Sequence, residues 1–172
     1  MARNIVRECG GGIAVSSRPG EGAEFKVYLP ASSERLKPSE AGASEAPQGR
    51  GERILVVEDE VMLSKSVSLV LSKNGYTVFA ARDAEEVNRI FEKEQGNFQI
   101  VFSDVVLKGK SGVDIVDELL AVKPGLKVLF ASGYMDIDSQ WPYINEKGFR
   151  FLQKPYDIPE LLRYIRKCLD EE

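Results

Sequence analysis

Histidine is absent from all 172 residues, and its absence excludes several kinds of catalytic site. A Ser-His-Asp or Cys-His nucleophile, a HExxH zinc site and any histidine general base all need this residue. For the same reason, the chain cannot itself carry a phosphohistidine.

Cysteine and long apolar runs are also scarce, and basic residues are slightly outnumbered by acidic ones, 23 against 27. Cys9 and Cys168 fit no CxxC pattern, so we expect neither a cysteine metal site nor a disulfide framework. Such sparse cysteine usage favours a reducing compartment. The net charge of -4 predicts no basic surface for nucleic acid. No apolar run reaches membrane-spanning length, and the first residues lack a signal-peptide core. We therefore expect a cytoplasmic chain without membrane contact, while membrane attachment of a longer parent protein stays open.

Composition sets two segments apart from the rest of the chain. Residues 31–51 are dominated by Ser, Ala, Glu, Pro and Gly, with Leu36 as their one large apolar side chain. So little apolar area cannot offset the entropy lost on ordering, which predicts a flexible linker. Residues 1–30 are too short for a domain. Two strand-like runs, 13–17 and 24–29, predict a hairpin that completes a larger domain.

Residues 52–172 alternate between two patterns. Short runs rich in Val, Ile and Phe predict five strands, at 53–57, 76–80, 99–103, 127–131 and 149–152. Apolar residues at helical spacing fill the intervals between them. In the fourth interval, Pro142 predicts a short helix that begins near the proline. This alternation predicts an α/β domain whose parallel sheet is covered by helices on both faces.

Polar side chains follow four of the predicted strands. Glu58 and Asp59 follow the first, Asp104 the third, Ser132 the fourth and Lys154 the fifth. Sites in such folds lie at the carboxyl ends of the strands, so we expect these groups to meet at one edge. Clustered carboxylates suit Mg²⁺. With a lysine ammonium and a hydroxyl, the cation would neutralise a phosphoryl group accepted by Asp104.

Four segments together resemble the receiver domain of two-component response regulators over residues 52–172. These segments are ILVVEDE (54–60), VFSDVVLKGKSG (101–112), VLFASGY (128–134) and FLQKPY (151–156). The resemblance implies a flavodoxin-like, three-layer α/β fold with a five-stranded parallel sheet in the order 2-1-3-4-5. It also implies Mg²⁺-dependent acceptance of a phosphoryl group from phosphohistidine, as in a phosphorelay.

The resemblance further implies a role for each site residue. The catalytic residues would be Asp104 as phosphoacceptor, Lys154 and Ser132. The conformational switch would be formed by Ser132 and Phe151. The metal ligands would be Glu58, Asp59, Asp104 and the backbone carbonyl of Val106. The implied partners are the phosphohistidine domain of a histidine kinase, a histidine phosphotransfer protein, and a second copy bound through the fourth helix, fifth strand and fifth helix.

The first segment resembles the C-terminal end of a histidine kinase ATP-binding domain. The resemblance rests on IVRECGGGIAVSSRPGEGAEFKVYLP, with Gly20 and Gly22 in its turn. The asparagine and glycine-rich nucleotide boxes of that family are absent, so we expect no kinase active site in this chain. A kinase end, a linker and a receiver in this order imply a fragment of a hybrid histidine kinase.

The chain departs from the receiver pattern near Asp104. Lys108 stands where a proline is common in the family, and Lys110 follows it. Val106 and Tyr134 occupy positions that control water access in this family, and neither can orient water, which predicts slow self-dephosphorylation.

Other interpretations remain beside the receiver. A phosphorylation-independent interaction module on the same fold is the main alternative. A haloacid-dehalogenase-type phosphatase would need an Asp at Val106, and a P-loop would need a glycine at Asp104. For Glu60 and Asp83 we expect only helix capping.

Overall fold

A computed structural model of the chain describes residues 2–20, 22–31, 47–133 and 137–171. The chain separates into two compact units, Met1–Ser44 and Glu45–Glu172. Most of the predicted linker, residues 32–46, lies outside the described residues. Within the described ranges, every helix falls short, in length or in hydrophobicity, of what a membrane crossing requires.

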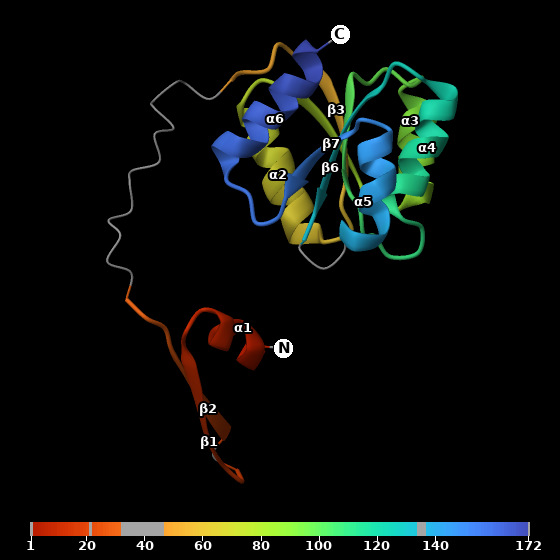
Figure 1. Ribbon diagram of the computed structural model, residues 1–172. Coiled ribbons are helices and arrows are strands. Elements are labelled where there is room, and N and C mark those ends of the chain that lie inside the picture. The colour runs from red at the N-terminus through yellow and green to blue at the C-terminus, as the bar shows by residue number, and fades with distance from the viewer. Residues whose placement is uncertain (1, 21, 32–46, 134–136, 172) are drawn as a thin grey trace. The chain divides into compact units, whose positions relative to one another are not determined.

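The first unit contains a short helix and the predicted hairpin. Helix α1 (Ala2–Glu8) precedes strands β1 (Gly12–Arg18) and β2 (Gly22–Tyr28) (Figure 1). The strands pair antiparallel, with Gly12 opposite Tyr28 and Arg18 opposite Gly22. Val6 and Ile13 are half-buried, but most of its large apolar side chains are exposed: Ile5, Val15, Phe25, Val27, Tyr28 and Leu29. The hairpin therefore buries little apolar surface of its own, as expected of an isolated hairpin.

The second unit alternates strands and helices throughout. Its elements are β3 (Arg53–Val57), α2 (Val61–Lys73), β4 (Thr77–Ala81), α3 (Ala84–Lys93), β5 (Ile100–Asp104), α4 (Gly112–Val122), β6 (Lys127–Ser132), α5 (Ile137–Glu146), β7 (Arg150–Gln153) and α6 (Ile158–Asp170). The five strands pair parallel in the order β4-β3-β5-β6-β7. This order is the predicted 2-1-3-4-5, so the α/β receiver fold is confirmed.

Helices cover both faces of the sheet. Helices α2 and α6 lie on one face, and α3, α4 and α5 lie on the other (Figure 1). Because side chains alternate along a strand, Ile54 and Val56 join the core under α2 and α6, while Leu55 and Val57 join the opposite core. All four are fully buried. Burial on both faces explains the continuous apolar run of this strand.

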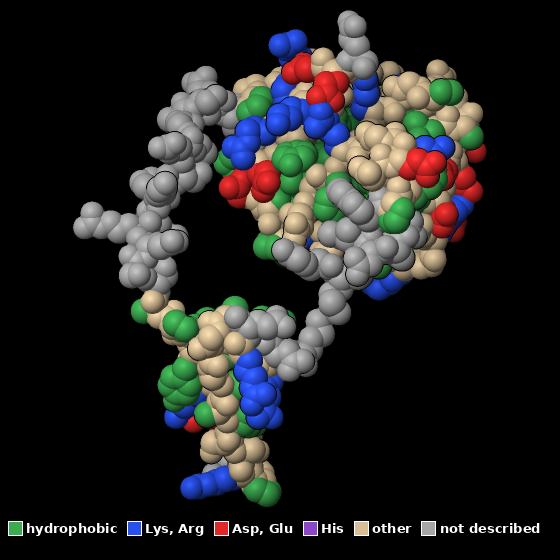
Figure 2. Space-filling view, in the orientation of Figure 1, with side chains coloured by type: hydrophobic (Ala, Val, Ile, Leu, Met, Phe, Trp, Pro, Cys, Tyr) green, Lys and Arg blue, Asp and Glu red, His purple; other side chains and the backbone are tan. Residues whose placement is uncertain are grey.

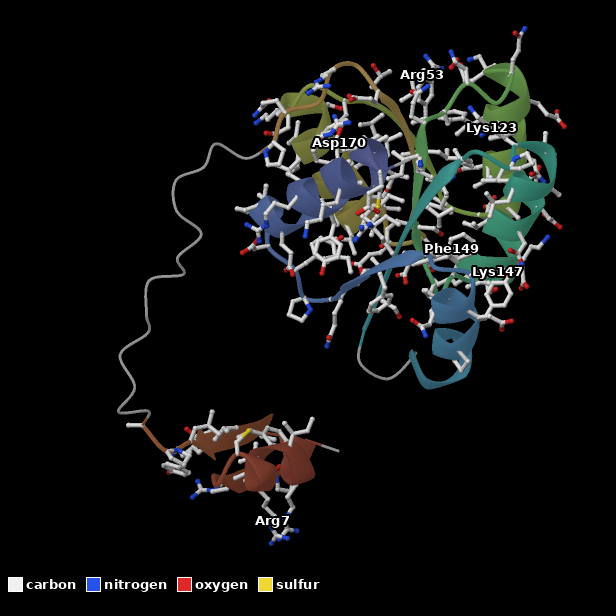
Figure 3. All side chains as sticks on the ribbon, turned by 45° about the horizontal axis from the view of Figure 1, so that its top comes forward. Arg7, Arg53, Lys123, Lys147, Phe149 and Asp170 are labelled. Carbon is white, nitrogen blue, oxygen red and sulfur yellow. The ribbon has the colours of Figure 1, made fainter. Side chains whose placement is uncertain are left out.

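Two basic residues close the amino-terminal edge of the sheet, and Figure 3 shows them at the same end of this unit. The Arg53 guanidinium lies 4.4 Å from the Phe79 ring centroid and 2.6 Å from the Glu94 carboxylate. The Lys123 ammonium donates to the carbonyl of Phe98 at 2.6 Å. The predicted site residues lie at the opposite edge, where the strands end.

The prediction for α5 is wrong. The helix begins at Ile137, so Pro142 lies inside it. A proline in this position deletes one hydrogen bond to the carbonyl four residues earlier. Tertiary contacts hold the turn that follows: Ile144 is 2% exposed, and the Tyr143 hydroxyl donates to the Asp117 carboxylate at 2.6 Å.

The two capping predictions have different outcomes. The Asp83 carboxylate accepts from the backbone N–H of Glu86 at 2.9 Å, so it caps α3 as expected. Glu60 precedes α2, but its side chain makes no capping hydrogen bond. Instead, its backbone N–H donates to the Glu58 carboxylate at 3.2 Å. This contact orients Glu58 rather than closing the helix.

Residues 48–52, called the strap here, are held against the turn between α2 and β4. The backbone N–H groups of Gly49 and Gly51 donate to the carbonyls of Asn74 and Gly75, at 2.7 and 2.9 Å. A Cβ on Gly49 would lie 2.8 Å from Gly75, so the two backbones touch. The Glu52 carboxylate also accepts from Arg166 of α6 at 2.5 Å.

Candidate functional site

The predicted site residues meet at the carboxyl edge of the sheet. Glu58 and Asp59 directly follow β3, Asp104 and Ser132 end β5 and β6, and Lys154 directly follows β7. These four strands are consecutive neighbours in the sheet. Parallel strands that stop in register bring residues from distant parts of the chain to one edge.

Lys154 joins two of the carboxylates. Its ammonium lies 2.6 Å from Asp104 Oδ2 and 2.9 Å from Glu58 Oε2. Burial opposes the charged ammonium, but the hydrogen bonds to Asp104 and Glu58 outweigh it and raise the pKa of Lys154. Glu58 is itself buried, at 7% exposure. A buried carboxylate needs such a partner because desolvation without one is costly.

The main chain around Asp104 is tightly packed. The backbone N–H of Val106 donates to Asp104 Oδ1 at 3.2 Å, so this carboxylate is held from two sides. The N–H of Gly112, the first residue of α4, donates to the carbonyl of Val105 at 2.9 Å. A Cβ at Gly112 would lie 1.8 Å from the Asp104 carbonyl oxygen. The start of α4 therefore rests directly on the residue that carries the central carboxylate.

Asp59 has a different cation beside it. Its Oδ2 lies 3.2 Å from the ammonium of Lys108, a side chain that is 89% exposed. Sequence reasoning noted Lys108 near the site but not this ion pair, since only the folded loop shows where the side chain reaches. Among the described residues, no group of three or more Cys, Asp and Glu side chains is arranged to hold a metal ion.

The two predicted switch residues lie on the same face of neighbouring strands. Ser132 is 1% exposed, and its hydroxyl has no hydrogen-bond partner among the described residues. Phe151 is half-buried, pairs in register with Phe130, and packs against the core under α3, α4 and α5. The backbone N–H of Lys154 donates to the backbone carbonyl of Ser132 at 2.8 Å, which joins the end of β7 to the end of β6.

Tyr156 lies two residues after Lys154 and was not among the predicted site residues. Its ring packs edge-on to Phe102, with centroids 6.2 Å apart, and its hydroxyl is buried without a described partner. Burial raises the pKa of Tyr156 to about 12, although Lys154 opposes the shift. The FLQKPY motif contains this tyrosine, but the motif carried no sign that its hydroxyl is unsatisfied.

Two residues were predicted to control water access. Val106 is half exposed beside Asp104, as a residue in that role requires. Tyr134 lies outside the described residues.

Comparison with known proteins identifies the second unit. The pattern of the response regulator receiver domain family matches residues 54–166. A solved receiver domain from Clostridium thermocellum is 27% identical, with a TM-score of 0.64, and covers 69% of this chain and 94% of its own. The solved receiver domain of the hybrid histidine kinase CckA is 30% identical, with a TM-score of 0.57, and covers 69% and 99%.

Two curated relatives align with the whole chain. The sensor kinase CckA of Brucella abortus is 29% identical over 181 residues, and the aerobic respiration control sensor protein ArcB of Escherichia coli is 27% identical over 177 residues. Both alignments cover 100% of this chain. The chain spans only 19% and 22% of those relatives, and about half of a Bacillus subtilis transcriptional regulatory protein.

Proposed function

Because the chain belongs to the response regulator receiver domain family, whose members act in two-component phosphorelay signalling, we propose that Asp104 is the residue that accepts the phosphoryl group. The observation that carries this proposal is the bridging position of Lys154. Its ammonium touches the Asp104 and Glu58 carboxylates. Ser132 ends the neighbouring strand, and its hydroxyl has no partner among the described residues.

In the proposed reaction, a carboxylate oxygen of Asp104 attacks the phosphorus of a phosphohistidine. The P–O bond forms, the P–N bond breaks, and the imidazole leaves with the electron pair. Lys154 stays within reach of the new phosphoryl oxygens while keeping its contact with Glu58. The Ser132 hydroxyl, which has no partner among the described residues, gains an acceptor in the phosphoryl group.

The residue types at this site suit a magnesium ion, although the described side chains are not already grouped around a metal position. Asp59, Asp104 and the backbone carbonyl of Val106 offer hard oxygen ligands, with Glu58 beside them, and Mg²⁺ prefers such ligands together with water. When bound, the cation supplies neutralisation of charge on the transferring phosphoryl group. Lys154 and the backbone N–H of Val106 hold the Asp104 carboxylate in place for attack.

The signal leaves the site through Ser132 and Phe151 in this proposal. A hydroxyl drawn toward the phosphoryl group vacates space on the face that it shares with Phe151. The aromatic ring then shifts inward, which favours a second conformation that already exists as a minor population.

We place the chain in a hybrid histidine kinase. The alignments of CckA and ArcB cover all of this chain, which supports the order kinase end (1–30), linker (31–51) and receiver (52–172), with the last linker residues held against the receiver as the strap. The proposed donor is the phosphohistidine domain of a histidine kinase, and a histidine phosphotransfer protein is the onward acceptor. Dimerisation through α5, β7 and α6 and a cytoplasmic location complete the proposal.

Intact mass spectrometry after incubation with acetyl phosphate and Mg²⁺ tests the acceptor. We expect the wild-type chain to gain one phosphoryl group and Asp104→Asn to gain none. Asp170→Asn makes the same change at a carboxylate that is 54% exposed on α6, and it should react like the wild type.

Two results would contradict the proposal. Equal modification of Asp104→Asn would place the acceptor elsewhere. No modification of any variant, together with no binding of beryllofluoride and Mg²⁺, would favour the phosphorylation-independent interaction module.

A further inference from the structure

The ion pair between Lys108 and Asp59 occupies one of the proposed metal ligands. The Lys108 ammonium lies 3.2 Å from Asp59 Oδ2, while Glu58 and Asp104 both contact Lys154. Each carboxylate of the site is therefore matched by an ammonium before any metal arrives. A cation that binds Asp59 must first compete with a charge that belongs to the chain itself.

Exposure distinguishes the two lysines. The Lys154 side chain is 22% exposed and bridges two carboxylates, whereas Lys108 is 89% exposed and extends from the loop between β5 and α4. A long, solvated side chain exchanges between partners quickly, and its ion pair is weak. Lys108 can thus leave Asp59 without any rearrangement of the sheet.

We propose that Lys108 is a tethered competitor of the divalent cation at Asp59. Its ammonium neutralises that carboxylate in the metal-free chain and withdraws when the metal binds. Lys108 is a positioning residue, since it acts on the reaction through Asp59 and not on the reacting atoms. The inference rests on the proposed metal site and adds that this loop residue sets its affinity.

The expected effect follows from the strength of exposed ion pairs. Such pairs contribute up to about 1 kcal/mol, which corresponds to about a fivefold change in affinity. Removing the Lys108 charge should therefore tighten Mg²⁺ binding about three- to fivefold. Dissolved salt weakens the interaction between exposed charges. The gain in Mg²⁺ affinity should therefore shrink as the salt concentration rises.

Isothermal titration calorimetry with Mg²⁺ on the full chain tests the inference, in salt of about 0.15 M to suppress long-range effects. Lys108→Met is expected to bind more tightly, and Lys108→Arg to match the wild type because it keeps the charge. Lys110→Met is the matched control: it loses the same charge two residues away, where the ammonium pairs with Glu118 instead.

An Asp59→Asn background separates competition from a structural role. The neutral amide no longer attracts the ammonium, so adding Lys108→Met there should change the Mg²⁺ affinity less than it does in the wild type.

The outcomes separate this inference from the function beneath it. Equal Mg²⁺ affinity in wild type and Lys108→Met would overturn the competition while leaving the metal site in place. An equal gain in Lys110→Met would reduce the effect to net charge and also overturn it. Failure of every variant to bind Mg²⁺ would remove the proposed metal site itself.

Discussion

The packing of α4 on Asp104 makes Gly112 sensitive to the smallest possible substitution. In Gly112→Ala, the added Cβ would lie 1.8 Å from the Asp104 carbonyl oxygen, 2.7 Å from Ser103 Oγ and 2.9 Å from the Asp104 carbonyl carbon. All three distances fall below the 3.0 Å that a Cβ keeps from other heavy atoms. Rotation of a side chain cannot relieve the shortest contact, because the Cβ position is fixed by the backbone of residue 112 and its partner is the backbone carbonyl of Asp104.

The expected loss of stability in Gly112→Ala has two contributions. Inserting a methyl group into a filled space costs about 1–3 kcal/mol. If α4 moves away, the hydrogen bond from the Gly112 N–H to the Val105 carbonyl is lost, at about 1 kcal/mol. We expect the free energy of unfolding to fall by about 2–4 kcal/mol in urea denaturation followed by circular dichroism. Phosphorylation should slow about tenfold or more, since small displacements of a reacting group are costly.

Two further variants make this reasoning refutable. Gly125→Ala adds the same methyl group where no atom lies within 4 Å, and its stability should stay within about 0.5 kcal/mol of wild type. Adding Ser103→Ala to Gly112→Ala should restore little, because the shortest contact is with the Asp104 carbonyl. A Gly112→Ala chain as stable as the Gly125→Ala chain would refute the close packing.

Two other predictions concern the surroundings of the site. Tyr156→Phe removes a buried hydroxyl without a described partner, so it should raise stability at neutral pH by about 1 kcal/mol in urea unfolding. The pKa of Tyr156 is about 12 in the folded chain and 10 in the unfolded chain, so the folded state holds the hydroxyl proton more tightly. The free energy of unfolding therefore falls as the pH rises from 10 toward 12. Tyr156→Phe should lose less stability in that window, and an unchanged alkaline limb would contradict the burial of the hydroxyl. Val106→Asn places an amide able to orient water beside Asp104, so the phosphorylated chain should lose its phosphoryl group faster in a mass time course. Val106→Ile is the control, and equal lifetimes for all three chains would remove Val106 from the control of water.

Periodicity and strand ends were enough to predict most of the fold. The five short apolar runs are unambiguous because strands buried on both faces have few polar residues to blur them. The order of the strands in the sheet came instead from the resemblance to receiver domains. The start of α5 was missed since Pro142 weighs against a helix locally, whereas the contacts of Tyr143 and Ile144 that hold the helix come from tertiary structure.

In the site, too, local sequence predicts some features, and tertiary contacts decide the others. Asp104, Ser132 and Lys154 were found because each ends or follows a strand, a position that the sequence reveals. The contacts of Lys108 with Asp59 and of Gly112 with Asp104 were not predictable, because they depend on how the loop after β5 folds back. Charges show the same limit: acidic and basic side chains are interleaved on the visible face of the second unit (Figure 2), and the sequence alone does not pair Arg150 with Glu171, which directly follows α6.

The strap has a mechanical consequence for the chain that enters the sheet. Its backbone hydrogen bonds, from Gly49 and Gly51 to the turn at Asn74 and Gly75, lie side by side along one stretch of backbone. A pull on the preceding residues loads these bonds together, and the Glu52–Arg166 contact shares the load. Any force transmitted along the chain must therefore break these contacts before it displaces β3 and the carboxylates that follow it.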